Sequence, residues 1–205
     1  MGTRHLTCVI KDGDYKVAQY GQWDGYPEGQ GLNILNFLKE MDRNVFEKKL
    51  DMVSWATEEE LEKMWLEAGL EPNSTLVSCS VADKFKELYP ENSRDTGSKV
   101  LRIIYNTEKP LKLENSIEFA KESLFCEWAY IINLDDNILE VYEGFNKTPL
   151  TEKDRFFYMQ EDKMQFYPVK IVTTFDLDNL PEEEEFIKTI YDIINSKTEE
   201  VCSNY

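Results

Sequence analysis

The chain of 205 residues contains no long apolar run, and its cysteines are few and scattered. No segment approaches the roughly 18–20 apolar residues that a membrane span needs, and no basic-then-apolar signal peptide opens the sequence, so we expect no membrane role. The four cysteines lie far apart, at positions 8, 79, 126 and 202, without a Cys-x-x-Cys pair. This pattern favours a cytoplasmic protein with reduced thiols over a disulfide scaffold.

Signatures of metal and cofactor sites are also missing. His5 is the single histidine, and one histidine with scattered cysteines gives no zinc or other histidine-based metal site. Asp135-Asp136-Asn137 lacks the EF-hand spacing and is typical of a turn. The glycine-rich stretch that begins at Gly21 is followed by no Gly-Lys-Ser/Thr and is no convincing dinucleotide fingerprint, and no Gly-x-Ser-x-Gly elbow occurs. We therefore expect neither a metal nor a cofactor.

Basic side chains are in a minority, with 23 lysines and arginines against 40 acidic residues and a formal net charge of −17. This balance argues against general nucleic-acid binding, because a phosphate-backbone binder needs a basic face. Residues 1–50 are neutral as a group, so the negative charge belongs to residues 51–205. It is densest at 58–62 and 182–185, where carboxylates at a helix start suit the positive end of the helix dipole.

The composition, 41% hydrophobic and 13% aromatic, is sufficient for a buried core and predicts one domain over residues 1–205. Strand-like runs at 5–10 and 15–20, joined by Asp12-Gly13, predict a β-hairpin, and runs at 125–134 and 138–142 predict a second one. Residues 169–175 predict a further strand. The expected fold class is α+β, an antiparallel sheet built from hairpins and covered by helices.

Helices are expected at 32–41, 44–52, 57–68, 80–88, 116–123 and from Pro181 to about Asn195. Thr57 with Glu60 forms a capping box, and Asn115 is the expected cap of the helix at 116–123. The run at 100–105 fits either a strand or a helix. Residues 145–163 are a polar excursion that fits a flap.

The most distinctive segment is the loop from Gly21 to Gly31, which holds four of the nine glycines together with Trp23, Asp24, Tyr26 and Glu28. Clustered glycines indicate sharp turns or a close approach of the backbone to another group. A ligand site with aromatic faces and acceptor groups fits this composition. A structural Ω-type loop, with Trp23 and Tyr26 packed inward, fits it equally well.

The predicted hairpin brings Arg4 and His5 to this loop, because a turn at 12–13 places position 5 roughly opposite position 20. The candidate catalytic residues are Asp24 and His5. The candidate ligand-binding residues are Arg4, His5, Tyr20, Gln22, Trp23, Asp24, Tyr26, Gly29 and Gly31. The alternative is that Arg4 pairs with Asp24 and that His5 is an ordinary strand residue.

The segments Gly2-Thr-Arg-His-Leu6 and Tyr20-Gly-Gln-Trp-Asp-Gly-Tyr-Pro27 resemble a family of small uncharacterised proteins from bacteria, bacteriophages and some fungi. The second hairpin, from Cys126 to Phe145, resembles another recurrent block of that family. The resemblance implies no established activity.

Residues 6–24 are also similar to the opening strand–turn–strand of N-terminal-nucleophile hydrolases. That resemblance implies a sandwich of sheets and helices. Gly2 offers no nucleophilic side chain and Thr3 lies one position too late, so the likeness concerns the fold and not the catalysis.

Two functions from different classes follow. The first is a small-ligand-binding or hydrolase-like protein whose site lies at residues 20–31 with Arg4 and His5. A nucleotide-like ligand suits these residue types, and amino acids or short peptides suit them nearly as well. The residues leave open whether the protein is an enzyme. The second is an acidic interaction protein, a phage-type inhibitor or nucleic-acid mimic that binds a basic protein partner without catalysis.

Overall fold

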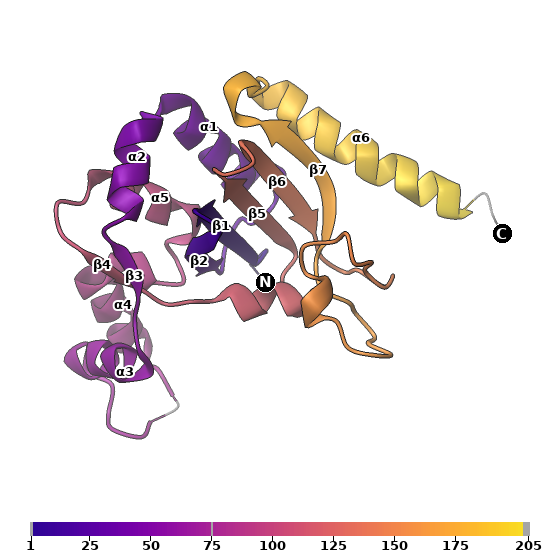
Figure 1. Ribbon diagram of the computed structural model, residues 1–205. Helices are drawn as coiled ribbons and strands as arrows, with labels where there is room; N and C mark the ends of the chain where they lie inside the picture. The colour runs from indigo at the N-terminus through magenta and orange to yellow at the C-terminus, as the bar shows by residue number, and fades with distance from the viewer. Residues whose placement is uncertain (1, 75, 203–205) are drawn as a thin grey trace.

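A central five-stranded sheet organises the chain in the computed structural model, which describes residues 2–74 and 76–202, without the side chains of 197–202 (Figure 1). The strand order is β2-β1-β5-β6-β7. The strands are β1 (His5–Lys11), β2 (Asp14–Gly21), β5 (Trp128–Asn133), β6 (Ile138–Glu143) and β7 (Lys170–Asp176). Their pairing is antiparallel except between β1 and β5, and the α+β class is confirmed.

Six α-helices accompany the described strands, most of them where apolar periodicity predicts them. They are α1 (Leu32–Glu40), α2 (Arg43–Leu50), α3 (Glu58–Glu67), α4 (Cys79–Leu88), α5 (Val100–Asn106) and α6 (Glu183–Cys202). The Thr57–Glu60 capping box is present at the start of α3. The ambiguous run at 100–105 is helical, and α6 continues beyond Asn195. The helix expected at 116–123 is a shorter 3₁₀ helix, Ile117–Lys121, whose Asn115 side chain accepts a hydrogen bond from the Ile117 amide.

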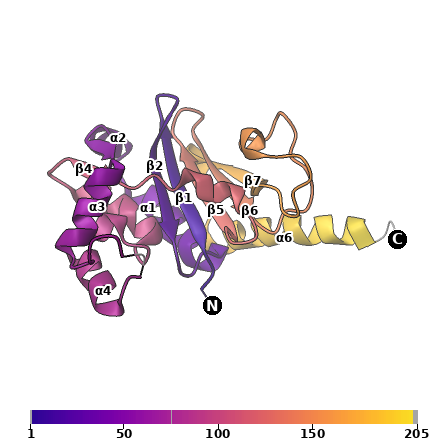
Figure 2. The ribbon, with the colours of Figure 1, turned by 90° about the horizontal axis from the view of Figure 1, so that it is seen from below.

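Each face of the sheet carries its own apolar core. On one face Val9, Tyr130 and Val141 pack with α1, α5 and α6. On the other, Leu6 and Ile131 pack with residues of the segment 145–168 and of the 3₁₀ helix. Figure 2 shows α6 on one side of the sheet and the segment 145–168 on the other. Strands that are covered on both faces explain the continuous apolar runs in β1 and β5.

The segment 145–168 is fastened to the sheet by a buried ion pair. Arg155 donates to both carboxylate oxygens of Glu140 on β6, a residue that is 2% exposed. Tyr142 and Asn133 donate to the same carboxylate. A buried carboxylate with all these donors is stabilised, whereas one without its cation would be costly. The polar segment that the sequence suggested as a flap is therefore held against one face of the sheet.

The first hairpin confirms the predicted turn, with Asp12 and Gly13 both at positive φ. Its register differs by one residue from the predicted one, because a β-bulge lies between Val9 and Ile10. Position 5 therefore faces Gly21, and Leu6 faces Tyr20. Directly opposite residues share a face of the sheet, so the His5 imidazole lies over a glycine that leaves room for it.

A smaller lobe lies beside the β2 edge of the sheet. It contains a two-stranded parallel ribbon of β3 (Val53–Trp55) and β4 (Leu111–Leu113), together with α3 and α4. Trp65 of α3 stacks on Phe85 of α4 with ring centroids 3.7 Å apart. The described residues form one large sheet and this ribbon, so they lack the stacked sheets that the hydrolase resemblance implies.

The register predicts that Gly21→Ala destabilises the protein through His5. A β-carbon at position 21 would overlap the His5 ring, and overpacking of this kind costs about 1–3 kcal/mol. The free energy of unfolding in urea measures the effect. In the double variant Gly21→Ala/His5→Ala the added methyl group enters the space that the ring leaves, so the combined loss should be smaller than the sum of the two single losses. Additive losses would contradict the contact.

Candidate functional site

The glycine loop packs tightly on its own chain. Gly25 donates its N–H to the Thr3 carbonyl at 2.9 Å and accepts a hydrogen bond from the Tyr130 hydroxyl at 2.9 Å. The other three glycines lie against His5, the Asp24 backbone and Tyr130 at positions where a β-carbon would be crowded. Close internal packing thus accounts for the clustered glycines. Trp23 and Tyr26 are nevertheless 45% and 39% exposed, so the aromatic residues are not packed inward.

His5 is fully buried between two glycines. Its ring lies against Gly21 on one side, and a β-carbon at Gly97 would come within 2.8 Å of its Cε1 and Nε2 atoms. Neither ring nitrogen has a hydrogen-bond partner among the described residues. Burial lowers the pKa of His5 from 6.5 to about 3, so the imidazole is neutral in the folded protein.

Arg4 and Asp24 turn to different partners, which corrects the alternative in which they form a pair. The Arg4 guanidinium lies over the Phe125 ring, 4.6 Å from its centroid. Asp24 accepts a hydrogen bond from the Tyr26 hydroxyl at 3.3 Å and has a φ of 56°. The catalytic candidates His5 and Asp24 are therefore a buried ring and an exposed carboxylate, and neither is set up as the base of a nucleophile.

The segment Ser93–Lys99 lies against the glycine loop, although about seventy residues separate the two in the sequence. Gln22 donates its N–H to the Arg94 carbonyl at 2.9 Å, and the Trp23 indole donates to Asp95 at 2.9 Å. The Gln30 side chain accepts hydrogen bonds from the amide and the hydroxyl of Ser98. Sequence reasoning missed this segment, because its turn-rich composition gives no sign of its partner.

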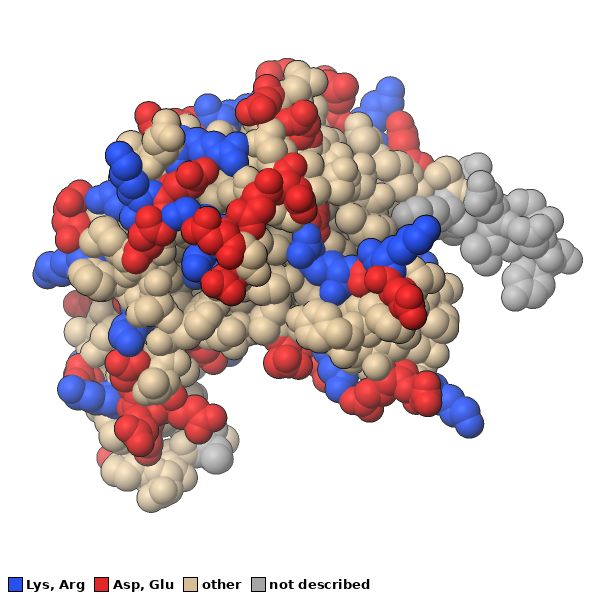
Figure 3. Space-filling view, in the orientation of Figure 1, with Lys and Arg blue, Asp and Glu red and all other residues tan. Residues whose placement is uncertain are grey.

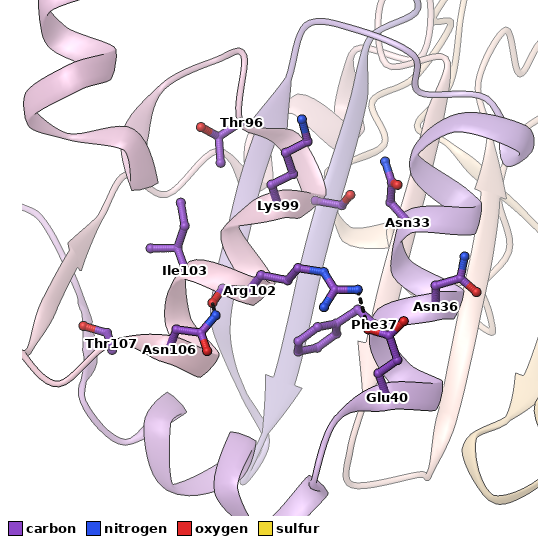
Figure 4. A pocket seen from close by; sticks show the side chains of 11 residues that line it. Asn33, Asn36, Phe37, Glu40, Thr96, Lys99, Arg102, Ile103, Asn106 and Thr107 are labelled. Atoms are coloured by element: carbon purple, nitrogen blue, oxygen red, sulfur yellow. Dashed lines mark hydrogen bonds and ion pairs between the residues drawn. The ribbon is translucent and has the colours of Figure 1, made fainter.

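Two cavities flank this segment, and the larger is a groove of about 840 Å³ between α1 and α5 (Figure 4). Asn33, Asn36 and Glu40 line it from α1. Arg102 reaches across from α5 to Glu40 at 2.7 Å and lies 5.9 Å from the Phe37 ring centroid. Arg102, the cation at the centre of the groove, is thus already paired with Glu40, and Lys99 lies at one end of the groove (Figure 4).

The second cavity, which we call the edge well, has a volume of about 420 Å³ and opens at the outer edge of β2. This volume lies within the usual range for small-molecule sites. The edge strand β2 contributes Tyr20 to the lining of this cavity. The segment 93–95 and residues 114–116 form two of its walls, and α3 and α4 close its outer side. Its lining includes Tyr20, Trp65, Cys79, Phe85, Arg94 and Ser116.

Arg94 supplies the edge well with an uncommitted cation, since its side chain forms no hydrogen bond or ion pair within the described part of the chain. The neighbouring Asp95 accepts hydrogen bonds from the Trp23 indole at 2.9 Å and from Lys86 at 3.1 Å, and these bonds, with the charges of Lys86 and Arg94, lower the pKa of Asp95. Burial raises the pKa of Tyr20 against the opposing charges of Arg4 and Arg94. The Tyr20 hydroxyl is therefore neutral and donates to Gln22 at 2.6 Å.

Of the predicted site residues, Tyr20 lines the edge well, while Gln22 and Trp23 hold its wall in place. Tyr26, Gly29 and Gly31 line neither of these two cavities, and the same is true of Arg4, His5 and Asp24. Arg94, Trp65 and Cys79 were missed, because they come from three distant segments. A ligand role for the loop itself stays a prediction.

Some members of each acidic cluster have structural partners at helix starts. Glu60 completes the α3 capping box and pairs with Lys112 at 3.2 Å. Glu182 pairs with Lys39 at 2.9 Å, and Glu183 accepts from Asn36 at 2.7 Å. Figure 3 shows acidic and basic side chains interspersed over the face it presents. These contacts fit the helix-dipole interpretation and leave no specific observation in favour of an acidic decoy.

The described residues contain no helix suited to crossing a membrane and no group of three or more His, Cys, Asp or Glu side chains placed to hold a metal ion. Comparison with protein-family models, with curated proteins and with solved structures finds no match for this chain. The resemblance to the family of small uncharacterised proteins therefore stays a prediction, and the likeness to the hydrolases is limited to the opening strand–turn–strand.

The buried His5 predicts a specific loss of stability in acid. The unfolded chain takes up a proton near pH 6.5, whereas the folded protein does so only near pH 3, so stability is complete above pH 6.5 and falls as the pH decreases towards 3. At pH 5 this single group should cost about 2 kcal/mol. Urea unfolding at pH 7 and pH 5 measures the change, and in His5→Leu the change should be smaller by that amount. An equal change in both proteins would contradict a buried neutral imidazole.

Proposed function

We propose that this chain is a small-ligand-binding protein whose site is the edge well, and that the ligand is nucleotide-like. The observation that carries the proposal is the meeting of an aromatic wall, an unpaired guanidinium and the edge of β2 around one cavity. Flat apolar rings suit a planar heterocycle, and arginine suits a phosphate. Binding rather than catalysis is favoured, because His5 and Asp24, the candidate catalytic residues, lie outside the cavity.

The aromatic wall is formed by Trp65 and Phe85, which stack on each other where the small lobe faces the sheet. Phe85 is 2% exposed and fixes the half-buried Trp65 at the cavity. A ligand ring placed there would gain apolar contact area without ordering mobile side chains. Cavities between two structural units are frequent ligand sites.

The charge pattern supports an anionic group on the ligand. Lys86 and Trp23 already bond to Asp95, whereas the Arg94 side chain forms no hydrogen bond or ion pair among the residues that the structure describes and acts on Asp95 through its charge alone. A phosphate or carboxylate would form charge-assisted hydrogen bonds with its guanidinium. At the centre of the α1–α5 groove, Arg102 is not free to bind an anionic ligand in this way, because it pairs with Glu40.

Calorimetric titration with adenosine, cytidine, guanosine and uridine 5′-monophosphates tests the proposal. Arg94→Gln should weaken the binding of the tightest of these at least about tenfold, since a hydrogen bond to a charged group contributes about 1.5–3 kcal/mol. Lys99→Gln is the matched control, because it removes the same charge from the same segment but lines the other cavity. The control should bind as the unmodified protein does.

Cys79 gives an independent readout, because it lines the edge well and is exposed. In a Cys202→Ser background, saturating nucleotide should slow the alkylation of Cys79 by iodoacetamide. The proposal fails if none of the four nucleotides binds saturably, or if Arg94→Gln and Lys99→Gln weaken binding equally.

A further inference from the structure

The outer edge of β2 is closed at two points and open at one residue between them. Ala18 accepts a hydrogen bond from the Ser116 amide at 2.9 Å, and Gln22 donates to the Arg94 carbonyl at 2.9 Å. Residues of an antiparallel strand alternate between facing their partner strand and facing away. Tyr20 has the same parity as Ala18 and Gln22, so its N–H and C=O also point outward, into the edge well.

The outward groups of Tyr20 have hydrogen-bonding capacity left. Within the described chain no group accepts a hydrogen bond from the Tyr20 N–H, and its carbonyl accepts one from the Gln19 side chain at 3.2 Å. A carbonyl oxygen has two lone pairs, so a second donor can still bind. The main chain of Tyr20 therefore offers a donor and an acceptor side by side.

The width of the opening selects a single ring over a peptide strand. An added strand would form hydrogen bonds with several alternate residues of the edge, but the bonds at Ala18 and Gln22 are already made by Ser116 and Arg94. One planar heterocycle with an acceptor next to an amine can bond to both groups of Tyr20 and fit between these anchors. Its flat faces would then lie beside the aromatic wall of Trp65 and Phe85.

We propose that the edge well recognises the base of a nucleotide through the main chain of Tyr20, with the acceptor–amine edge of the base on Tyr20 and the phosphate on Arg94. This inference rests on the proposed function of the well and names the chemical class of its ligand. The recognition uses the backbone, so it does not depend on the identity of the side chain at position 20.

Amide hydrogen exchange measured by NMR is the first test. In the free protein the Tyr20 amide should exchange faster than the amides of Gln19 and Gly21, which face β1 within the sheet. Saturating AMP should slow exchange at Tyr20 at least about tenfold and leave the Gln19 and Gly21 amides nearly unchanged.

Two ligand analogues provide the second test. On the Watson–Crick edge, which is the edge that would meet Tyr20, 1-deaza-AMP lacks the N1 acceptor and N6,N6-dimethyl-AMP lacks the amine donor, while both keep the ring system and the phosphate. Each should bind about tenfold more weakly than AMP, because each leaves one polar group of Tyr20 without its partner.

The outcomes separate this inference from the proposed function. If AMP binds and Arg94→Gln weakens it, but Tyr20 exchange and analogue affinities do not change, base recognition by Tyr20 is wrong and the nucleotide site stands. If no nucleotide binds, both proposals are overturned. If an acetylated, amidated tripeptide protects the Tyr20 amide and AMP does not, strand addition replaces base recognition.

Discussion

The contact on which the rest of the structure depends is the His5 imidazole held between Gly21 and Gly97. It joins the start of β1, the end of β2 and the turn before α5 in one buried place, where only glycines leave room for the ring. Gly97 also has a φ of 51°, a conformation that other residues adopt at a cost. Both ring nitrogens lack partners among the described residues, so the ring contributes through packing and not through hydrogen bonds.

This contact has a consequence at the molecular surface. With Gly97 fixed over His5, the segment 93–99 lies along the glycine loop and forms its hydrogen bonds to Gln22, Trp23 and Gln30. The same segment carries Arg94 to the β2 edge and closes one end of the opening at Tyr20. The conspicuous glycine loop is thus a support, and the cavity that it supports lies on the far side of the neighbouring segment.

Local signals in the sequence were sufficient for much of the fold. Asp12-Gly13 specified the first hairpin, and Thr57 with Glu60 specified the start of α3. The sequence placed position 5 only roughly opposite position 20, and the observed partner is Gly21, because a bulge depends on the whole sheet and leaves no local sign. The parallel pairing of β1 with β5 and the docking of 93–99 join residues far apart in the chain, so Tyr20 was predicted for the site but Arg94 and Trp65 were not.

The central claim is that the edge well, and not the glycine loop or the α1–α5 groove, is where this chain binds its ligand. A crystal structure of the protein grown with AMP tests it most directly. Density for the nucleotide is expected in the edge well, with the base against the Tyr20 main chain and the phosphate at Arg94. Nucleotide density confined to the α1–α5 groove or to the surface of the glycine loop, with the edge well empty, would contradict the claim.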